Sequence, residues 1–208
     1  MRAKDFRQQA WAALKNNWGT AVLSILIMSL IVGGLGIIPT VGSIATLIIT
    51  GPLQLGLVIV MIKIIRKEPV QINNLFDGFK NFMTSFTLYL VNGIFVFLWS
   101  LLFIIPGIIK SYAYSMSYYI LNDHPEMTQS EAREASIAMM KGHKWELFCL
   151  QFSFIGWYLL TILTFGILSL WVSPYQATAT AAFYENLKKA NEPTVIKDEP
   201  NIDDIFAE

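Results

Sequence analysis

The chain has 208 residues, of which 54% are hydrophobic and only 14% are charged, and its mean hydropathy is +0.50. A soluble domain usually carries about 25% charged residues, so this composition indicates a membrane protein. The formal net charge is zero, which argues against a protein that recruits nucleic acid through its overall field. The single cysteine, Cys149, cannot form an intramolecular disulfide.

Three long stretches contain no charged side chain: residues 21–62, 81–109 and 147–184. A helix of about 20 apolar residues spans the hydrocarbon layer of a bilayer. The predicted fold class is therefore all-α, a polytopic membrane helix bundle that forms one domain over residues 18–189.

Residues 1–17 precede the first apolar stretch and have a helical pattern, with Phe6, Ala10 and Leu14 on one face. Two interpretations stay open: an amphipathic helix on the surface of an anionic leaflet, or a flank that only fixes orientation. The segment is basic, with a net charge of +3 from Arg2, Lys4, Arg7 and Lys15 against Asp5. The apolar run that follows is longer than that of a signal peptide, so we expect a retained first span.

About six membrane-embedded helices are predicted, with approximate ranges 18–38, 43–65, 83–105, 108–121, 145–165 and 167–187. Proline lacks an amide hydrogen and glycine permits sharp changes of direction. The candidate helix breaks are Pro52, Pro106, Gly107 and Pro174, with a further reversal at Gly166. The fourth helix is short, and it either crosses fully or is re-entrant.

One extended polar loop covers residues 122–144. Within it Thr128 and Glu131 have the spacing of a capping box, which predicts a short helix over 129–140. The end of the chain, residues 190–208, is acidic and poor in apolar residues, which predicts a disordered tail.

The distribution of positive charge distinguishes two topologies. With four spans, Lys110, Arg133, Lys141 and Lys144 would all face the outside. If the chain instead reverses at Pro106-Gly107 and near Gly166, only Lys110 of the 15 basic residues lies near the outer side. The second topology is favoured. It predicts a multi-pass protein of the cell membrane with both termini in the cytoplasm.

Several motifs resemble those of a bacterial membrane family catalogued as domain of unknown function number 975. They are LWSLLFIIPGIIK at residues 98–110, MKGHKWELF at 140–148, FIGW at 154–157, Pro174-Tyr175 and Ala182-Phe183-Tyr184. The resemblance covers about residues 1–188. A more distant resemblance links the chain to the membrane domain of some glycerophosphodiester phosphodiesterases and implies a shared six-helix layout. Neither resemblance implies a substrate or functional residues.

Polar groups within the apolar stretches are the candidate functional residues. The four amides Gln54, Asn92, Gln151 and Gln176 are expected to join helices by hydrogen bonds, or alternatively to form a transport site. No Asp, Glu or Arg lies deep in a predicted span, which argues against ion-coupled transport.

Other patterns predict packing and lipid contact. The small residues Ala177, Thr178, Ala181 and Ala182 permit close helix approach, within the chain or between copies. Lys141 and Lys144, at a membrane entry, are candidate contacts for lipid headgroups. Aromatic residues suit the membrane interfaces, among them Trp18, Trp157, Trp171 and Tyr175.

No pattern predicts chemistry. His124 and His143 lack the further ligands that a zinc site needs. The loop carboxylates Asp123, Glu126, Glu131 and Glu134 could be read as an acid–base pair, but capping and solvation explain them more simply. We therefore expect no cofactor and no enzyme. The leading hypothesis is a membrane protein that acts through lipid or protein partners, and the alternative is a small transporter or channel-like protein.

Overall fold

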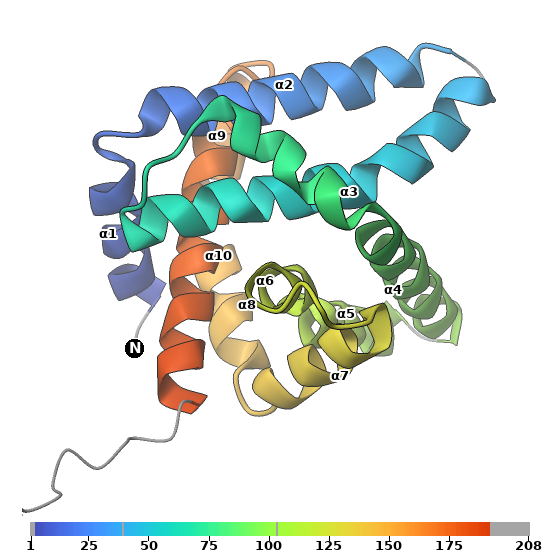
Figure 1. The fold of residues 1–208 in the computed structure, drawn as a ribbon. Coiled ribbons are helices and arrows are strands. Elements are labelled where there is room, and N and C mark those ends of the chain that lie inside the picture. Colours follow the sequence, from blue (N-terminus) through green and yellow to red (C-terminus); the bar gives the residue numbers. More distant parts are fainter. Residues whose placement is uncertain (1–2, 39, 103, 192–208) are drawn as a thin grey trace, which may run out of the picture.

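A computed structural model describes residues 3–38, 40–102 and 104–191, and within these ranges every regular element is a helix (Figure 1). The helices are α1 (Ala3–Leu14), α2 (Trp18–Gly36), α3 (Val41–Arg66), the 3-10 helix η1 (Ile72–Asn81), α4 (Phe82–Leu102), α5 (Ile104–Tyr114), α6 (Ser117–Asp123), α7 (Gln129–Met139), α8 (Lys144–Phe152), α9 (Ile155–Leu163) and α10 (Ser169–Asn191). The predicted all-α class is confirmed. Most of the predicted acidic tail lies outside the described residues.

Helix α3 is the centre of the molecule. From Leu53 to Ile64 most of its side chains are buried, and it contacts α2, η1, α4, α6 and α10. In Figure 1, α2 and α3 run alongside each other, and α1 lies beside α10. Because α3 contacts so many elements, its apolar side chains form the middle of the core.

Glycines let η1 and α4 approach the α3 backbone. A Cβ atom built at Gly56 would overlap the carbonyl of Leu75, and one built at Gly78 would overlap the carbonyl of Pro52. A Cβ atom built at Gly51 would lie 2.6 Å from the Ser85 carbonyl oxygen on α4, which is also too close. The segment after α3 therefore returns along it with backbone against backbone.

The chain reverses where α4 ends and α5 begins. Gly107 packs against Ser100, and the Lys110 ammonium lies 5.0 Å from the ring centroid of Trp99. These residues are 7 and 11 positions apart, which on a continuous helix would separate them by roughly 10 and 16 Å. A second reversal follows α9, where Phe165 and Gly166 have φ values of 51° and 87°.

Two of the expected helix breaks are absent. Pro52 and Pro174 lie inside the continuous helices α3 and α10. A proline removes one hydrogen bond, and contacts with neighbouring elements can compensate in a tightly packed bundle. Pro106 is the third residue of α5, where a missing amide hydrogen costs nothing because the first turn has no intrahelical acceptor. The predicted fifth span is in turn divided into α8 and α9.

The apolar face of the N-terminal segment packs against the rest of the protein. Phe6, Ala10 and Leu14 of α1 are buried, and the ring of Phe6 lies 5.3 Å from that of Phe183 on α10. The apolar face predicted for this segment is therefore covered by α10.

Large apolar side chains are exposed along the hairpins. They include Ile37 and Ile44 near the turn after α2, Leu101 and Ile105 near the turn after α4, and Phe165 near the turn after α9. Within the part of the chain that the structure describes, four helical stretches are long and apolar enough to cross a bilayer: 18–36, 42–66, 72–101 and 144–163. Exposed apolar surface of this extent marks contact with lipid or protein, so the architecture is compatible with a membrane protein.

Candidate functional site

A cavity of about 820 Å³ lies between the helices, and all four amides predicted from the sequence line it. Gln54 comes from α3, Asn92 from α4, Gln151 from α8 and Gln176 from α10. Tyrosine, serine and threonine hydroxyls from α4, α5, α6 and α10 add to the lining. The volume is within the range of small-molecule sites in proteins.

Two of the amides join helices. The Tyr112 hydroxyl on α5 donates a hydrogen bond to Gln151 Oε1, at 2.8 Å, and the Tyr158 hydroxyl on α9 donates to Gln176 Oε1. The first contact joins α5 to α8, and the second joins α9 to α10. Both amides nevertheless keep a place in the cavity wall.

Two other polar atoms of the cavity residues have no partner. Asn92 Oδ1 and the Tyr118 hydroxyl are buried, and neither forms a hydrogen bond with the described residues. An unpaired buried polar group costs about 1–3 kcal/mol, and in native proteins such groups call for an explanation. A bound molecule with its own hydrogen-bonding groups would satisfy both.

The described lining contains no Asp, Glu, Lys, Arg or His side chain. Most of it is apolar, contributed by leucine, isoleucine, valine and aromatic rings. A wall of this kind suits an uncharged molecule that is partly apolar and carries hydroxyl or amide groups. A full charge would lose its hydration there without gaining a partner of opposite sign.

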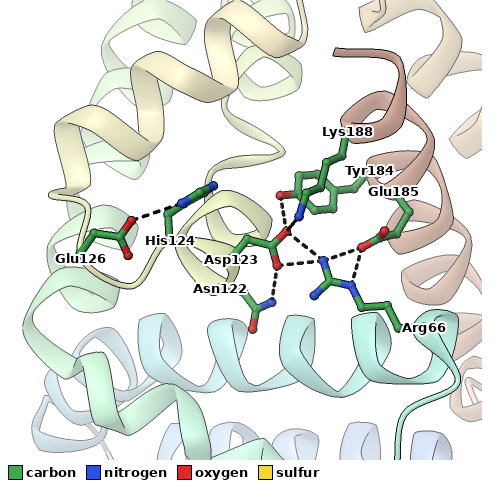
Figure 2. Close-up of polar contacts among 8 residues, drawn as sticks. All are labelled: Arg66, Asn122, Asp123, His124, Glu126, Tyr184, Glu185 and Lys188. Carbon is green, nitrogen blue, oxygen red and sulfur yellow. Dashed lines mark hydrogen bonds and ion pairs between the residues drawn. The ribbon is translucent and has the colours of Figure 1, made fainter. Parts of the chain in front are cut away.

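A cluster of ion pairs joins three helices, α3, α6 and α10 (Figure 2). Arg66, at the end of α3, donates hydrogen bonds to both carboxylate oxygens of Asp123 and to Glu185 Oε1, each at 2.8 Å. Lys188 Nζ and the Tyr184 hydroxyl on α10 also donate to Asp123 Oδ2, at 2.7 and 3.0 Å. Two cations therefore face two carboxylates.

The Asp123 side chain is only 5% exposed, although it follows the last apolar residues of α6. Burial acts to raise the pKa of its carboxyl, but the hydrogen bonds from Lys188 and Arg66 outweigh burial, and the pKa lies below its ordinary value. A carboxylate held ionised by hydrogen bonds from two cations is unsuited to proton transfer at neutral pH. The cluster instead fixes the ends of α3, α6 and α10.

The cluster and the cavity meet through two tyrosines whose rings are in contact at a tilt. The ring of Tyr119, which lines the cavity, lies 5.2 Å from the ring of Tyr184, which donates to Asp123. The position of the ion pairs therefore determines the position of one cavity wall.

The loop carboxylates do not form an acid–base pair. Glu131 closes the capping box with Thr128, and Glu126 lies 3.2 Å from the His124 ring on the surface. His143 contacts Glu146 at the same distance. Lys141 is exposed and Lys144 is half-buried, both where α7 joins α8.

The small-residue face of α10 packs within the chain. Thr178, Ala181 and Ala182 are fully buried, and Ala177 is half-buried against the core. These residues therefore pack inside one chain, and self-association through this face stays a prediction.

Sequence reasoning did not find the ion-pair cluster. Arg66 comes just after the predicted span 43–65, and Asp123 is one of the carboxylates of the polar loop, so neither stands out from the sequence. The usable signal is their shared position, since each lies at the end of an apolar helix. Opposite charges at helix ends on one side of a membrane are candidates for pairing.

Comparisons with known proteins give one result. The model of the family described as protein of unknown function (DUF975) matches residues 1–110 and 101–191. No curated protein and no solved structure matches the chain, so the more distant resemblance to glycerophosphodiester phosphodiesterases is without support. With matches that together cover residues 1–191, the chain belongs to the DUF975 family.

Proposed function

We propose that this protein is a non-enzymatic, multi-pass protein of the cell membrane that binds a small uncharged molecule between its helices and moves it across the bilayer. The observation that carries the proposal is the convergence of four amides on one cavity, with Asn92 Oδ1 and the Tyr118 hydroxyl unpaired among the described residues. Such a site favours the transporter-like alternative over a protein that acts only through partners.

The unpaired atoms indicate what the molecule must offer. Asn92 Oδ1 can only accept, so the bound molecule must supply a hydrogen-bond donor. The Tyr118 hydroxyl can donate or accept. Hydroxyl and amide groups meet both needs without charge. Polyols and other neutral hydroxylated solutes are therefore the class we propose.

Transport is tested in proteoliposomes by light scattering, with glycerol, xylitol and sucrose as probes of increasing size. We expect at least one solute to enter faster than it enters protein-free liposomes. Asn92→Leu should slow that entry by about tenfold, because the polar contact worth about 1.4 kcal/mol is lost. Gln129→Leu, on α7 and outside the cavity, is the matched control.

Tyr118→Phe separates a binding role from a structural one. The substitution removes an unpaired buried hydroxyl, so the ligand-free protein should become more stable, by about 1 kcal/mol. Solute entry should nevertheless fall. A variant that loses stability and entry together would indicate that the hydroxyl serves the fold, and equal entry with and without the protein would reject transport.

A further inference from the structure

A second pocket, of about 360 Å³, is walled by aromatic rings from the two ends of the chain. Trp11 and Trp18 come from the α1–α2 junction, and Trp157, Trp171 and Tyr175 come from α9 and α10. The ring of Trp11 meets those of Trp18 and Tyr175 edge to face, at 5.4 and 5.5 Å between centroids. Trp11, Trp157 and Trp171 remain 40–54% exposed, so the pocket is open to the surroundings.

A cation lies beside this pocket without a carboxylate partner. Arg7 is one turn before Trp11 on α1, and its Nη1 donates to the Ser153 carbonyl at 3.2 Å, one turn before Trp157. Among the described residues no carboxylate pairs with Arg7, and its buried Nε has no hydrogen-bond partner. A guanidinium with an unused donor matches the geometry of a phosphate oxygen.

We propose that the pocket and Arg7 together bind an anionic phospholipid, with the phosphate at Arg7 and an acyl chain against the tryptophans. The order of these residues along the chain fits a phosphate at Arg7 and an acyl chain against the tryptophans. Arg7 precedes Trp11, and Trp18 begins the first apolar helix. The cation therefore lies toward the surface and the aromatic wall toward the hydrocarbon, which is also the order of phosphate and acyl chain in a lipid.

The charge of the neighbourhood selects among lipids. The N-terminal segment carries Lys4, Arg7 and Lys15 against Asp5 among its described residues. Positive charge near the surface enriches anionic lipids and does not favour zwitterionic ones. An organic cation in the aromatic pocket is disfavoured for the same reason, because Arg7 would repel it.

Fluorescence quenching by brominated lipids tests the proposal in the full-length protein. A pocket reporter carries Trp99→Phe and Trp145→Phe, so that only the four pocket tryptophans emit. A matched bulk reporter keeps Trp99 and Trp145 and replaces the other four by phenylalanine. Each is placed in phosphatidylcholine bilayers that contain a minor fraction of phosphatidylglycerol with brominated chains.

Quenching of the pocket reporter should exceed that of the bulk reporter by about fivefold, as expected for local enrichment by one favourable basic contact. Brominated phosphatidylcholine at the same fraction should quench both reporters equally. Arg7→Gln should remove the excess quenching of the pocket reporter, and Arg7→Lys should restore part of it. Inorganic phosphate should not change the quenching of either reporter.

Equal quenching of the two reporters by phosphatidylglycerol would overturn the proposal, and this arm requires no change at Arg7. An excess that is the same for both lipids would overturn the anionic preference. Displacement by inorganic phosphate would assign the Arg7 site to the free anion and so reject a lipid.

Discussion

Asp123 shows how one carboxylate can order the ends of three helices. It accepts hydrogen bonds from Arg66, Lys188 and Tyr184 while its side chain is almost fully buried. A buried carboxylate is costly to desolvate, and several charge-assisted hydrogen bonds are needed to offset that cost. Removal of one partner would leave the others buried without full compensation.

Asp123→Asn should therefore destabilise the protein at pH 7, by about 1–3 kcal/mol. The pKa of Asp123 is lowered in the folded state, so its contribution is complete above the ordinary carboxyl pKa of 3.8. It is lost as the pH falls through the lower, folded-state value. Unfolding free energies measured in detergent between pH 7 and pH 3 should thus fall for the native protein and fall less for the variant.

Glu126→Gln is the matched control, because Glu126 is exposed and its ion pair, with His124, lies on the surface. It should leave stability within about 0.5 kcal/mol of the native value. A double-mutant cycle with Lys188→Gln adds a second check. If the effects of Asp123→Asn and Lys188→Gln add fully, the two side chains do not interact and the cluster is not a unit.

Among the elements, the contact between α3 and η1 depends on the absence of side chains. A methyl group at Gly56 would overlap the Leu75 carbonyl, and backbone cannot move aside as a flexible side chain can. Gly56→Ala should cost about 1–3 kcal/mol or more. Gly34→Ala on α2, where a Cβ would meet nothing within 4 Å, should instead stabilise by about 0.5–1 kcal/mol.

The two alanine variants are compared by their thermal midpoints in the same detergent. The comparison separates packing from helix propensity, because both changes raise propensity equally. If Gly56→Ala proved as stable as Gly34→Ala, close approach of η1 to α3 would be contradicted.

The sequence predicts best those elements that are determined by interactions between residues close together along the chain. The capping box at Thr128 and Glu131 predicts α7 almost to the residue, because the bonds that define it lie within four positions. The existence and type of the apolar helices also follow from composition. Pro52 and Pro174 were misread as breaks because their compensation comes from other helices, which local sequence does not show.

The candidate site shows the same difference between features with local causes and features that depend on distant contacts. The four amides were identified because a polar group in an apolar stretch is visible by itself. Their convergence on one cavity depends on how seven helices pack. The partners of Asp123 lie 57 and 65 positions away along the chain, and no periodicity connects them.

At the scale of the molecule, the ion pairs help to determine how many times the chain crosses the membrane. Arg66 ends α3 and Asp123 ends α6, where the polar loop begins, and their side chains are 2.8 Å apart. In the four-span topology these residues would lie on opposite sides of the membrane, roughly 30 Å apart. The reversal before α5 brings the chain back instead, so that the loop lies at the same end as Arg66.

Labelling of single cysteines tests this arrangement in a Cys149→Ser background. Ser43, near the turn between α2 and α3, and Ser130, on α7, allow matched Ser→Cys changes of minimal size. With positive charge kept in the cytoplasm, a membrane-impermeant maleimide should label position 43 in intact cells. Position 130 should label only after the membrane is opened. Because Asp123 ties the loop to Arg66, labelling of both positions from outside would contradict the ion pair as well as the six-helix topology.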